Sequence, residues 1–385
     1  MSDFFDVMLN AAAKETPSRT ERGVAIYGAG GTGKKVLNAL RKQGTPVIAF
    51  LDEFSKSTAI EGVPVRRLSD PATPRNVTVI VAVFNRERNA RYSDIRERVQ
   101  SSGYTSIFSF EQFYLSDPSA IEGSFFWLSD PSYLTSRIDE VKHVDTLWAD
   151  QLSRTLYREQ LLYRLTGDQS QLHNPTADTQ YLPPDVPMPS GPHRFIDVGA
   201  FDGDTLDALS RMGVTFERIL AFEPDMMNFR ALIKRVREHG PYSPQTILIP
   251  CGVGRTCASL PFEEDGTESA KAVVSLTGTD RVNTKVPIVS LDEVAFGFRP
   301  TYIKFDVEGF EEEALYGMKN TIEAERPMLA VSVYHKPCDL FQIPLLLASW
   351  DISADFYLRS HGEHAFETVL YMIPHASGSE ERHKK

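Results

Sequence analysis

Short apolar runs alternate with helix-like stretches over the first part of the chain. Four runs rich in β-branched and aromatic residues predict strands: VAIY (24–27), VIAFL (47–51), VTVIVAV (77–83) and TSIFSF (105–110). Helical patterns fall between them, at residues 33–43 and 86–102. Continuous apolar strands separated by helices are typical of a parallel sheet that is covered on both faces. We therefore predict an α/β domain at residues 1–115.

The next segment, residues 116–193, predicts a linker. We expect its aromatic run FFW (125–127) to contribute to a core between domains, because large aromatic side chains usually carry burial. Over residues 138–165 apolar positions recur at steps of mostly three and four, which predicts one amphipathic helix of about eight turns that ends at Gly167. The proline-rich residues 168–193 predict an extended connector.

A second α/β pattern occupies residues 194–375. Its apolar strands are RILAFE (218–223), QTILIP (245–250), TYIKFDV (301–307) and MLAVSVY (328–334), followed by ADFYLRS (354–360) and FETVLYMI (366–373). The last two runs are separated only by a short polar turn, so they must pair antiparallel. We predict a mostly parallel, seven-stranded sheet that ends in an antiparallel hairpin, and a disordered tail at residues 376–385.

Composition narrows the class of protein. The chain has 385 residues, 52 acidic and 41 basic, with a net charge of −11. This balance argues against nucleic acid as the main partner, because neutralising phosphates needs a basic surface. The N-terminus has neither the basic start nor the apolar core of a secretory signal, and no apolar run approaches the ~18 residues of a membrane span. The cysteines Cys251, Cys257 and Cys338 lack metal-site spacing and predict free thiols in the cytoplasm.

The first candidate site is the glycine loop GAGGTGKK (28–35), which lies between a strand and a helix. A P-loop needs a hydroxyl residue after its lysine, and Lys35 stands there instead. The dinucleotide turn of a Rossmann-like domain fits better, with Gly28, Gly30 and Gly33 in the loop and Asp52 at the end of the next strand, where a ribose-binding carboxylate belongs. The sequence leaves open whether this loop binds a nucleotide or is an empty scaffold.

The second candidate site is FIDVGAFDGDTL (195–206). Asp197 ends a strand, and Gly199 and Gly203 shape the turn that follows. Phe201 occupies the middle glycine position of the pyrophosphate fingerprint, so the loop suits a ligand without a pyrophosphate, such as S-adenosylmethionine. Glu223 ends the next strand, where its carboxylate can accept hydrogen bonds from both ribose hydroxyls.

A third polar element is YIKFDVEGFEEE (302–313). Asp306 and Glu308 follow a central strand, and both are expected to reach the crevice at the carboxyl edge of the sheet. Glu312 and Glu313 fall on the outer face of the next helix, where we expect them to be solvated and inert.

Together, FIDVGAFDGDT, AFEPD, VSLDEV (289–294), YIKFDVEGFE and MLAVSVYHKPCDL resemble the FkbM family of S-adenosylmethionine-dependent methyltransferases over residues 195–373. The preceding LLYRLTGD (161–168) is similar to a segment of its long, two-domain members. The resemblance implies a class I methyltransferase fold for residues 194–375. It also implies O-methylation of a saccharide, a nucleotide-sugar or another polyhydroxylated metabolite.

The resemblance further implies roles for the residues at the motif positions. The methionine part of the cofactor would be cradled by Asp197, Gly199 and Gly203, the ribose held by Glu223, and the amino group or the acceptor faced by Asp306 and Glu308. Many members have DVGANxG where this chain has DVGAFDG, and Asp202 joins the expected cofactor loop.

Methyl transfer to an alcohol also needs a base for the proton. His335 ends the strand MLAVSVYH at the same sheet edge as Glu308, and Asp306 is the second candidate. The residues do not decide whether a divalent metal is used, which small molecule or saccharide accepts the methyl group, or which oligomer forms. Two other functions stay open: an NAD-dependent oxidoreductase working through GAGGTG, and a non-catalytic nucleotide- or sugar-binding protein.

Overall fold

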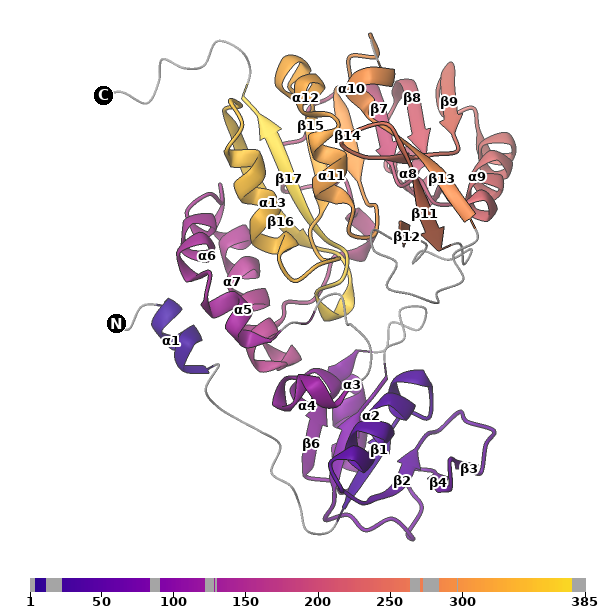
Figure 1. Ribbon diagram of the computed structural model, residues 1–385, viewed down its shortest axis with the longest axis vertical. Helices are drawn as coiled ribbons and strands as arrows, with labels where there is room; N and C mark the ends of the chain where they lie inside the picture. The colour runs from indigo at the N-terminus through magenta and orange to yellow at the C-terminus, as the bar shows by residue number, and fades with distance from the viewer. Residues whose placement is uncertain are drawn as a thin grey trace. The chain divides into compact units, whose positions relative to one another are not determined.

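The structure is a computed structural model that describes residues 4–11, 23–83, 91–121, 128, 130–263, 271–272, 284–295 and 297–375. The chain forms two compact units (Figure 1). The first comprises Met1–Lys142, Thr155–Pro175 and Glu363–Ala365, and the second comprises His143–Arg154, Thr176–Gly362 and Phe366–Lys385. The aromatic run 125–127 and the predicted tail at 376–385 lie outside the described residues.

The first unit is built on a six-stranded sheet in the order β3-β4-β2-β1-β5-β6. Its strands are β1 Val24–Tyr27, β2 Val47–Leu51, β3 Ala59–Ile60, β4 Val63–Arg66, β5 Thr78–Val81 and β6 Ser106–Ser109. All neighbours pair in parallel except β3 and β4, which form a short hairpin. All residues of β1 and β5 are buried, as continuous apolar runs predict.

The four predicted strands of this sheet are confirmed. The apolar pattern of the sequence did not predict the hairpin β3–β4. Its strands have two and four residues, too few for a periodic signal. The turn that joins them, Glu61 and Gly62, has φ values of 48° and 81°, which is typical of tight hairpin turns. The helices that lie wholly within the first unit are α1 Phe4–Ala11, α2 Gly31–Lys42, α3 Tyr92–Ser101, α4 Phe110–Ser116 and α5 Pro131–Thr135.

The prediction of a single helix over 138–165 is wrong. The structure has two helices, α6 Ile138–Asp145 and α7 Gln151–Thr166. Asp150 starts the second helix by accepting a hydrogen bond from Ser153 N at 2.7 Å. Its carboxylate also forms a 2.6 Å ion pair with Arg359 of the distant strand β16 (Ala354–Ser360). The apolar period of the sequence continues through this break and does not reveal it. The cap and the tertiary ion pair mark where the second helix begins. Gly167, with φ of 67°, ends α7 as expected.

The second unit contains a seven-stranded sheet in the order β16-β17-β15-β14-β7-β8-β9. Its strands are β7 His193–Val198, β8 Phe216–Phe222, β9 Gln245–Ile249, β14 Tyr302–Phe305, β15 Met328–Ser332, β16 Ala354–Ser360 and β17 Thr368–Pro374. The first five are parallel to one another, and β17 is antiparallel to both β15 and β16. The predicted mostly parallel sheet with a terminal antiparallel hairpin is confirmed.

A smaller four-stranded sheet, in the order β10-β13-β11-β12, also belongs to this unit. Its strands are β10 Gly252–Val253, β11 Ala258–Glu263, β12 Lys271–Ala272 and β13 Thr284–Val289. The sequence patterns did not predict this sheet.

The helices of the second unit are α8 Asp204–Arg211, α9 Met226–His239, α10 Leu291–Val294, α11 Glu311–Tyr316, α12 Lys319–Glu325 and α13 Asp339–Ala348.

One face of the large sheet is covered by α8 and α9. Leu206 and Leu209 of α8 and Leu232 of α9 pack on alternate strand residues, together with the connector residue Tyr181. Phe195 and Tyr302 of the same cluster are two residues before Asp197 and Lys304. Because side chains alternate along a strand, Asp197 and Lys304 point to the same face of the sheet as this cluster.

Among the described helices, none combines the length and the apolar character needed to cross a membrane.

Candidate functional site

The candidate site lies at the carboxyl ends of three adjacent strands, β14, β7 and β8. In an open parallel sheet the ligand crevice forms at the point where the strand order reverses, and here that point is between β7 and β14. Asp197 belongs to the end of β7, Glu223 follows β8, and Asp306 follows β14. The structure thus brings the polar residues predicted from separate motifs to one sheet edge.

Gly199 allows the turns after β7 and β14 to approach each other closely. It has a φ of 85°, and a Cβ atom added there would lie 1.8 Å from the carbonyl oxygen of Asp306. No other residue fits without moving the backbone. The turn of the second glycine loop is therefore held directly against the residue expected to face the ligand.

Lys304 is the buried cation of this edge. Its neighbour across the β7–β14 pairing is Asp197, and its Nζ donates to Asp197 Oδ1 at 3.0 Å and to the Gly199 carbonyl at 2.7 Å. Burial raises the pKa of Asp197 to about 6, against the opposing charge of Lys304. Burial alone lowers the pKa of Lys304, but the carboxylates of Asp197 and Asp306 outweigh it and hold that pKa above its usual value. Both groups are therefore charged at neutral pH.

Tyr181 of the proline-rich connector reaches into the same edge. Its hydroxyl donates to Asp306 Oδ2 at 2.8 Å, and Lys304 Nζ lies 5.2 Å from the centre of its ring. Its backbone is fixed from both sides, because its N–H donates to the Tyr371 hydroxyl and its carbonyl accepts from the Tyr302 hydroxyl. The connector is thus anchored, and it sets the orientation of the Asp306 carboxylate.

Glu223 is tied to the glycine loop by backbone hydrogen bonds. Phe201 N donates to its Oε2 at 2.9 Å and Asp225 N donates to its Oε1 at 2.8 Å. Burial raises the pKa of Glu223 to about 7, although these two donors oppose the shift. The Asp225 side chain caps α9 by accepting from the N–H groups of Met227 and Asn228.

Asp202 is placed differently from the other cofactor-loop residues. Its carboxylate is paired with Arg235 of α9, whose Nε also donates to the Asp202 carbonyl at 2.7 Å. The same guanidinium donates to Asp207 of α8 at 2.8 Å. Next to it, Gly203 has a φ of 87° and begins α8. In this arrangement Asp202 fixes the loop against α9, so any contribution to a cofactor is made through the loop backbone.

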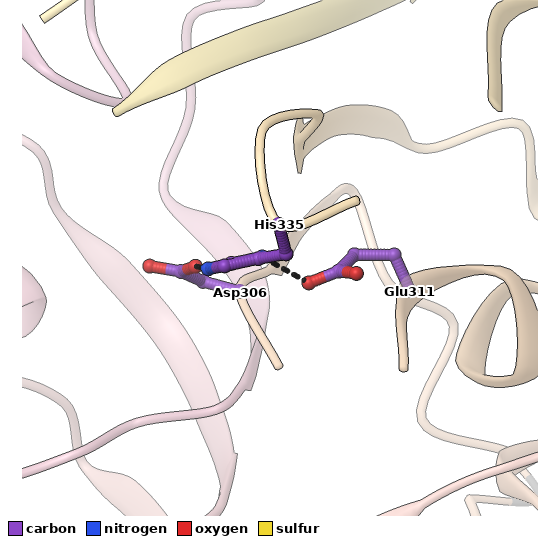
Figure 2. Close-up of side chains that lie close together, drawn as sticks. All are labelled: Asp306, Glu311 and His335. Atoms are coloured by element: carbon purple, nitrogen blue, oxygen red, sulfur yellow. Dashed lines mark hydrogen bonds and ion pairs between the residues drawn. The ribbon is translucent and has the colours of Figure 1, made fainter. Parts of the chain in front are cut away.

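His335 lies three residues beyond β15 and is surrounded by carboxylates (Figure 2). Its Nδ1 is 2.7 Å from Glu311 Oε1, while its Nε2 is 3.5 Å from both Asp306 Oδ1 and Glu308 Oε1. Burial taken alone lowers the pKa of His335, but Glu311 and Glu308 outweigh it and hold the pKa well above its usual value. The imidazole therefore carries a proton on each nitrogen at neutral pH, and in that form it cannot act as a base.

The first glycine loop has the geometry of a tight strand-to-helix turn. A Cβ atom added at Gly33 would lie 2.0 Å from the Gly28 carbonyl oxygen, so α2 packs directly on the loop, whereas Gly30 borders open space. Asp52 lies beside the loop, where its Oδ2 accepts from Ala29 N at 2.9 Å. Its Oδ1 accepts from the backbone N–H groups of Phe54 and Ser55 in the turn that follows β2, so the carboxylate ties this turn to the glycine loop.

Sequence reasoning missed three contributors: Lys304, Tyr181 and Glu311. For Lys304 a signal was present, since a lysine in an otherwise apolar central strand needs a buried counter-charge. Glu311 differs from its neighbours Glu312 and Glu313 in the helical period, and it alone of the three is buried, but no role was assigned to it. For Tyr181 no local signal existed, because its contacts come from strands more than 100 residues away in the chain.

Comparison with known proteins adds to this geometry. Residues 197–365 match the family model of the methyltransferase FkbM domain, and residues 23–94 match that of the PglD N-terminal domain. No curated protein matches the chain. A crystal structure of methyltransferase FkbM from Methylobacillus flagellatus KT superposes with a TM-score of 0.76 at 20% identity, covering 96% of this chain and 99% of that one. The structural likeness shows a shared fold. Residues 197–365 are therefore a domain of the FkbM methyltransferase family, preceded by a Rossmann-like domain that resembles the N-terminal domain of PglD.

Proposed function

We propose that residues 194–375 are the catalytic domain of an S-adenosylmethionine-dependent O-methyltransferase. Its acceptor would be a hydroxyl of a saccharide, a nucleotide-sugar or another polyhydroxylated metabolite. The domain match supports a methyltransferase. The observation that carries the finer proposal is the meeting of Asp197, Glu223 and Asp306 at the carboxyl ends of β7, β8 and β14, where an open sheet binds its ligand.

In this proposal Glu223 holds the ribose and the Gly199 turn supports the methionine part. Glu223 is already oriented by its two backbone donors, so its remaining lone pairs are available to the ribose hydroxyls. Asp197 is neutralised by Lys304, and we assign it the role of fixing the turn in shape for the cofactor. Gly203 and Asp202 contribute by holding the loop against α9.

The reaction is an in-line displacement. The acceptor oxygen forms a bond to the methyl carbon while the S–CH₃ bond breaks, giving a methyl ether and S-adenosylhomocysteine, and the hydroxyl proton leaves to a base. Most of the acceleration comes from positioning the two reactants. Asp306 is 22% exposed in its side chain, and we assign it the role of orienting the acceptor hydroxyl and taking its proton. When no metal ion is bound, His335, protonated as described, would add positive charge next to the developing alkoxide.

The test begins with calorimetric titration of the full chain with S-adenosylhomocysteine and, separately, with NAD. We expect binding of S-adenosylhomocysteine that is weakened at least tenfold in Glu223→Gln, because a hydrogen bond to a charged group contributes about 1.5–3 kcal/mol. Asp52→Asn is the matched control and should leave this binding unchanged. Binding of NAD alone, lost in Asp52→Asn, would refute the proposal and favour an oxidoreductase.

The acceptor is then sought by methyl-label transfer. The purified chain is incubated with methyl-labelled S-adenosylmethionine and a panel of free sugars, nucleotide-sugars and their deoxy analogues. Transfer to one polyol, absent for the analogue that lacks one hydroxyl, would identify both the acceptor and the position. Transfer to an amine or a thiol in preference to every polyol would refute O-methylation.

We also propose that the N-terminal domain binds the nucleotide end of such an acceptor through Gly28, Gly30, Gly33 and Asp52. The open space next to Gly30 and the close packing of α2 on the loop support this. Titration of the full chain with a uridine diphosphate sugar should show binding that Asp52→Asn weakens and Glu223→Gln does not. Equal affinity in all three proteins, or none at millimolar levels, would remove this role.

A further inference from the structure

The cluster around His335 brings three carboxylates close to one imidazole. Asp306 and Glu308 face one side of the imidazole ring, and Glu311 faces the other. Figure 2 shows the carboxylates of Asp306 and Glu311 on opposite sides of the ring. Potential oxygen ligands therefore lie near both nitrogens of the imidazole.

The carboxylate oxygen Asp306 Oδ1 is buried and lacks a hydrogen-bond donor among the described residues. A buried carboxylate oxygen without a donor costs free energy unless a cation or another ligand satisfies it. One ligand atom each from Asp306, Glu311 and His335 also lies within 4.8 Å of the other two.

We propose that Asp306, Glu308 and His335 bind a divalent cation, through Oδ1, Oε1 and Nε2. The two 3.5 Å separations from Nε2 suit this role, because ligands bonded at about 2.1 Å to one ion lie roughly 3.0–3.5 Å apart. On binding, the cation takes the place of the proton on Nε2, which is released to solvent. One nitrogen with two carboxylate oxygens favours a first-row ion such as Mn²⁺ over Ca²⁺.

Glu311 has a separate part in this site. Its Oε1 accepts from His335 Nδ1 at 2.7 Å and also from the N–H groups of Val307 and Gly309 at 3.0 and 3.3 Å. A carboxylate that holds the second nitrogen of a histidine ligand fixes the ring orientation and increases its basicity. Glu311 is thus the positioning residue of the site, fixed in turn by the backbone of the loop that carries the other two acids.

The site is open enough for exchange and for an acceptor. The side chains of Asp306 and Glu308 are 22% and 23% exposed, while His335 and Glu311 form its closed floor. A bound cation with free positions could take one or two hydroxyl oxygens of a vicinal diol and lower their pKa. This use of the cation rests on the proposed methyl transfer, whereas cation binding itself does not.

The experiment measures Mn²⁺ binding to the full chain without any cofactor or acceptor. Metal-free protein is titrated with Mn²⁺, and the free ion is followed by electron paramagnetic resonance. We expect one Mn²⁺ per chain and a nitrogen hyperfine coupling from His335 in the bound spectrum. Asp306→Asn and Glu308→Gln should each weaken binding at least tenfold, and Glu311→Gln by about 10- to 100-fold.

Glu312→Gln is the matched control, since it makes the same charge change on the exposed side of the same helix and should leave Mn²⁺ affinity unchanged. Circular dichroism melts identify any variant that does not fold, and Glu308→Gln, whose side chain is partly exposed, remains informative if a buried variant fails. No Mn²⁺ bound at millimolar levels, or unchanged affinity in Glu308→Gln, would overturn the proposal. A chain that transfers methyl groups without binding Mn²⁺ would refute the cation site alone.

Discussion

Glu223 makes cofactor binding depend on pH if residues 194–375 use S-adenosylmethionine. The residue is 6% exposed, and burial raises the pKa of its carboxyl group from 4.5 to about 7. Hydrogen bonds from ribose hydroxyls favour the ionised form. The apparent affinity should therefore follow the ionised fraction, which rises from about one tenth at pH 6 to about nine tenths at pH 8. We expect S-adenosylhomocysteine to bind about tenfold more tightly at pH 8 than at pH 6.

The same shift has the opposite effect on the stability of the ligand-free protein. Because the pKa of Glu223 is higher in the folded state, the folded chain holds more protons than the unfolded chain between about pH 4.5 and 7. Its contribution to stability is complete below this window and is lost as the pH rises through it. The shift corresponds to roughly 3 kcal/mol. Urea denaturation of wild type and Glu223→Gln at pH 5 and pH 8 should show this difference.

Calorimetry of wild type, Glu223→Gln and Glu217→Gln at pH 6, 7 and 8 is the assay. Glu217 lies on the same strand but is exposed, so Glu217→Gln should keep the full pH dependence. Glu223→Gln should bind weakly and with a flat profile. If wild type binds S-adenosylhomocysteine equally well at pH 6 and pH 8, or if Glu223→Gln keeps the slope, then Glu223 is not the ribose ligand.

Two further predictions concern the shape of the crevice. Lys304→Met leaves Asp197 buried without its counter-charge, so the free energy of unfolding, measured by urea denaturation at pH 8, should fall by about 3–5 kcal/mol. The loss should be smaller at pH 5, because Asp197 is then protonated. An equal loss at both pH values would contradict the ion-pair account. Gly199→Ala should lower the melting temperature far more than Gly213→Ala, although both glycines have positive φ. The added Cβ would lie 1.8 Å from the Asp306 carbonyl oxygen at Gly199 and in open space at Gly213. Similar decreases in melting temperature would mean that backbone strain alone limits these positions.

Several elements followed from local pattern alone. The runs VAIY and ADFYLRS became the strands Val24–Tyr27 and Ala354–Ser360 at the predicted residues, because apolar and β-branched residues over four to seven positions suffice to specify a buried strand. The short polar turn before residue 366 required an antiparallel hairpin. The cofactor-loop residues were found because the glycine spacing and the acids at strand ends are themselves local.

Other features depend on residues that are distant in sequence. The break between α6 and α7 was missed because the apolar period continues through it, and the ion pair of Asp150 with Arg359 of β16 is a contact between residues distant in sequence. The small four-stranded sheet was missed because two of its strands have only two residues. In both cases the local signal is weak or favours the wrong element, and a long-range contact decides the outcome.

The sequence by itself determined two α/β patterns, their strands and the identity of the acids that end those strands, since each of these depends on neighbouring residues. Only the tertiary structure decided what those acids do. The pairing of β7 with β14 placed Lys304 against Asp197, and the connector brought Tyr181 to Asp306. The end of β15 placed His335 among carboxylates that keep it protonated. Charge and proton affinity depend on burial and on facing groups, and only the assembled sheet brings those groups together.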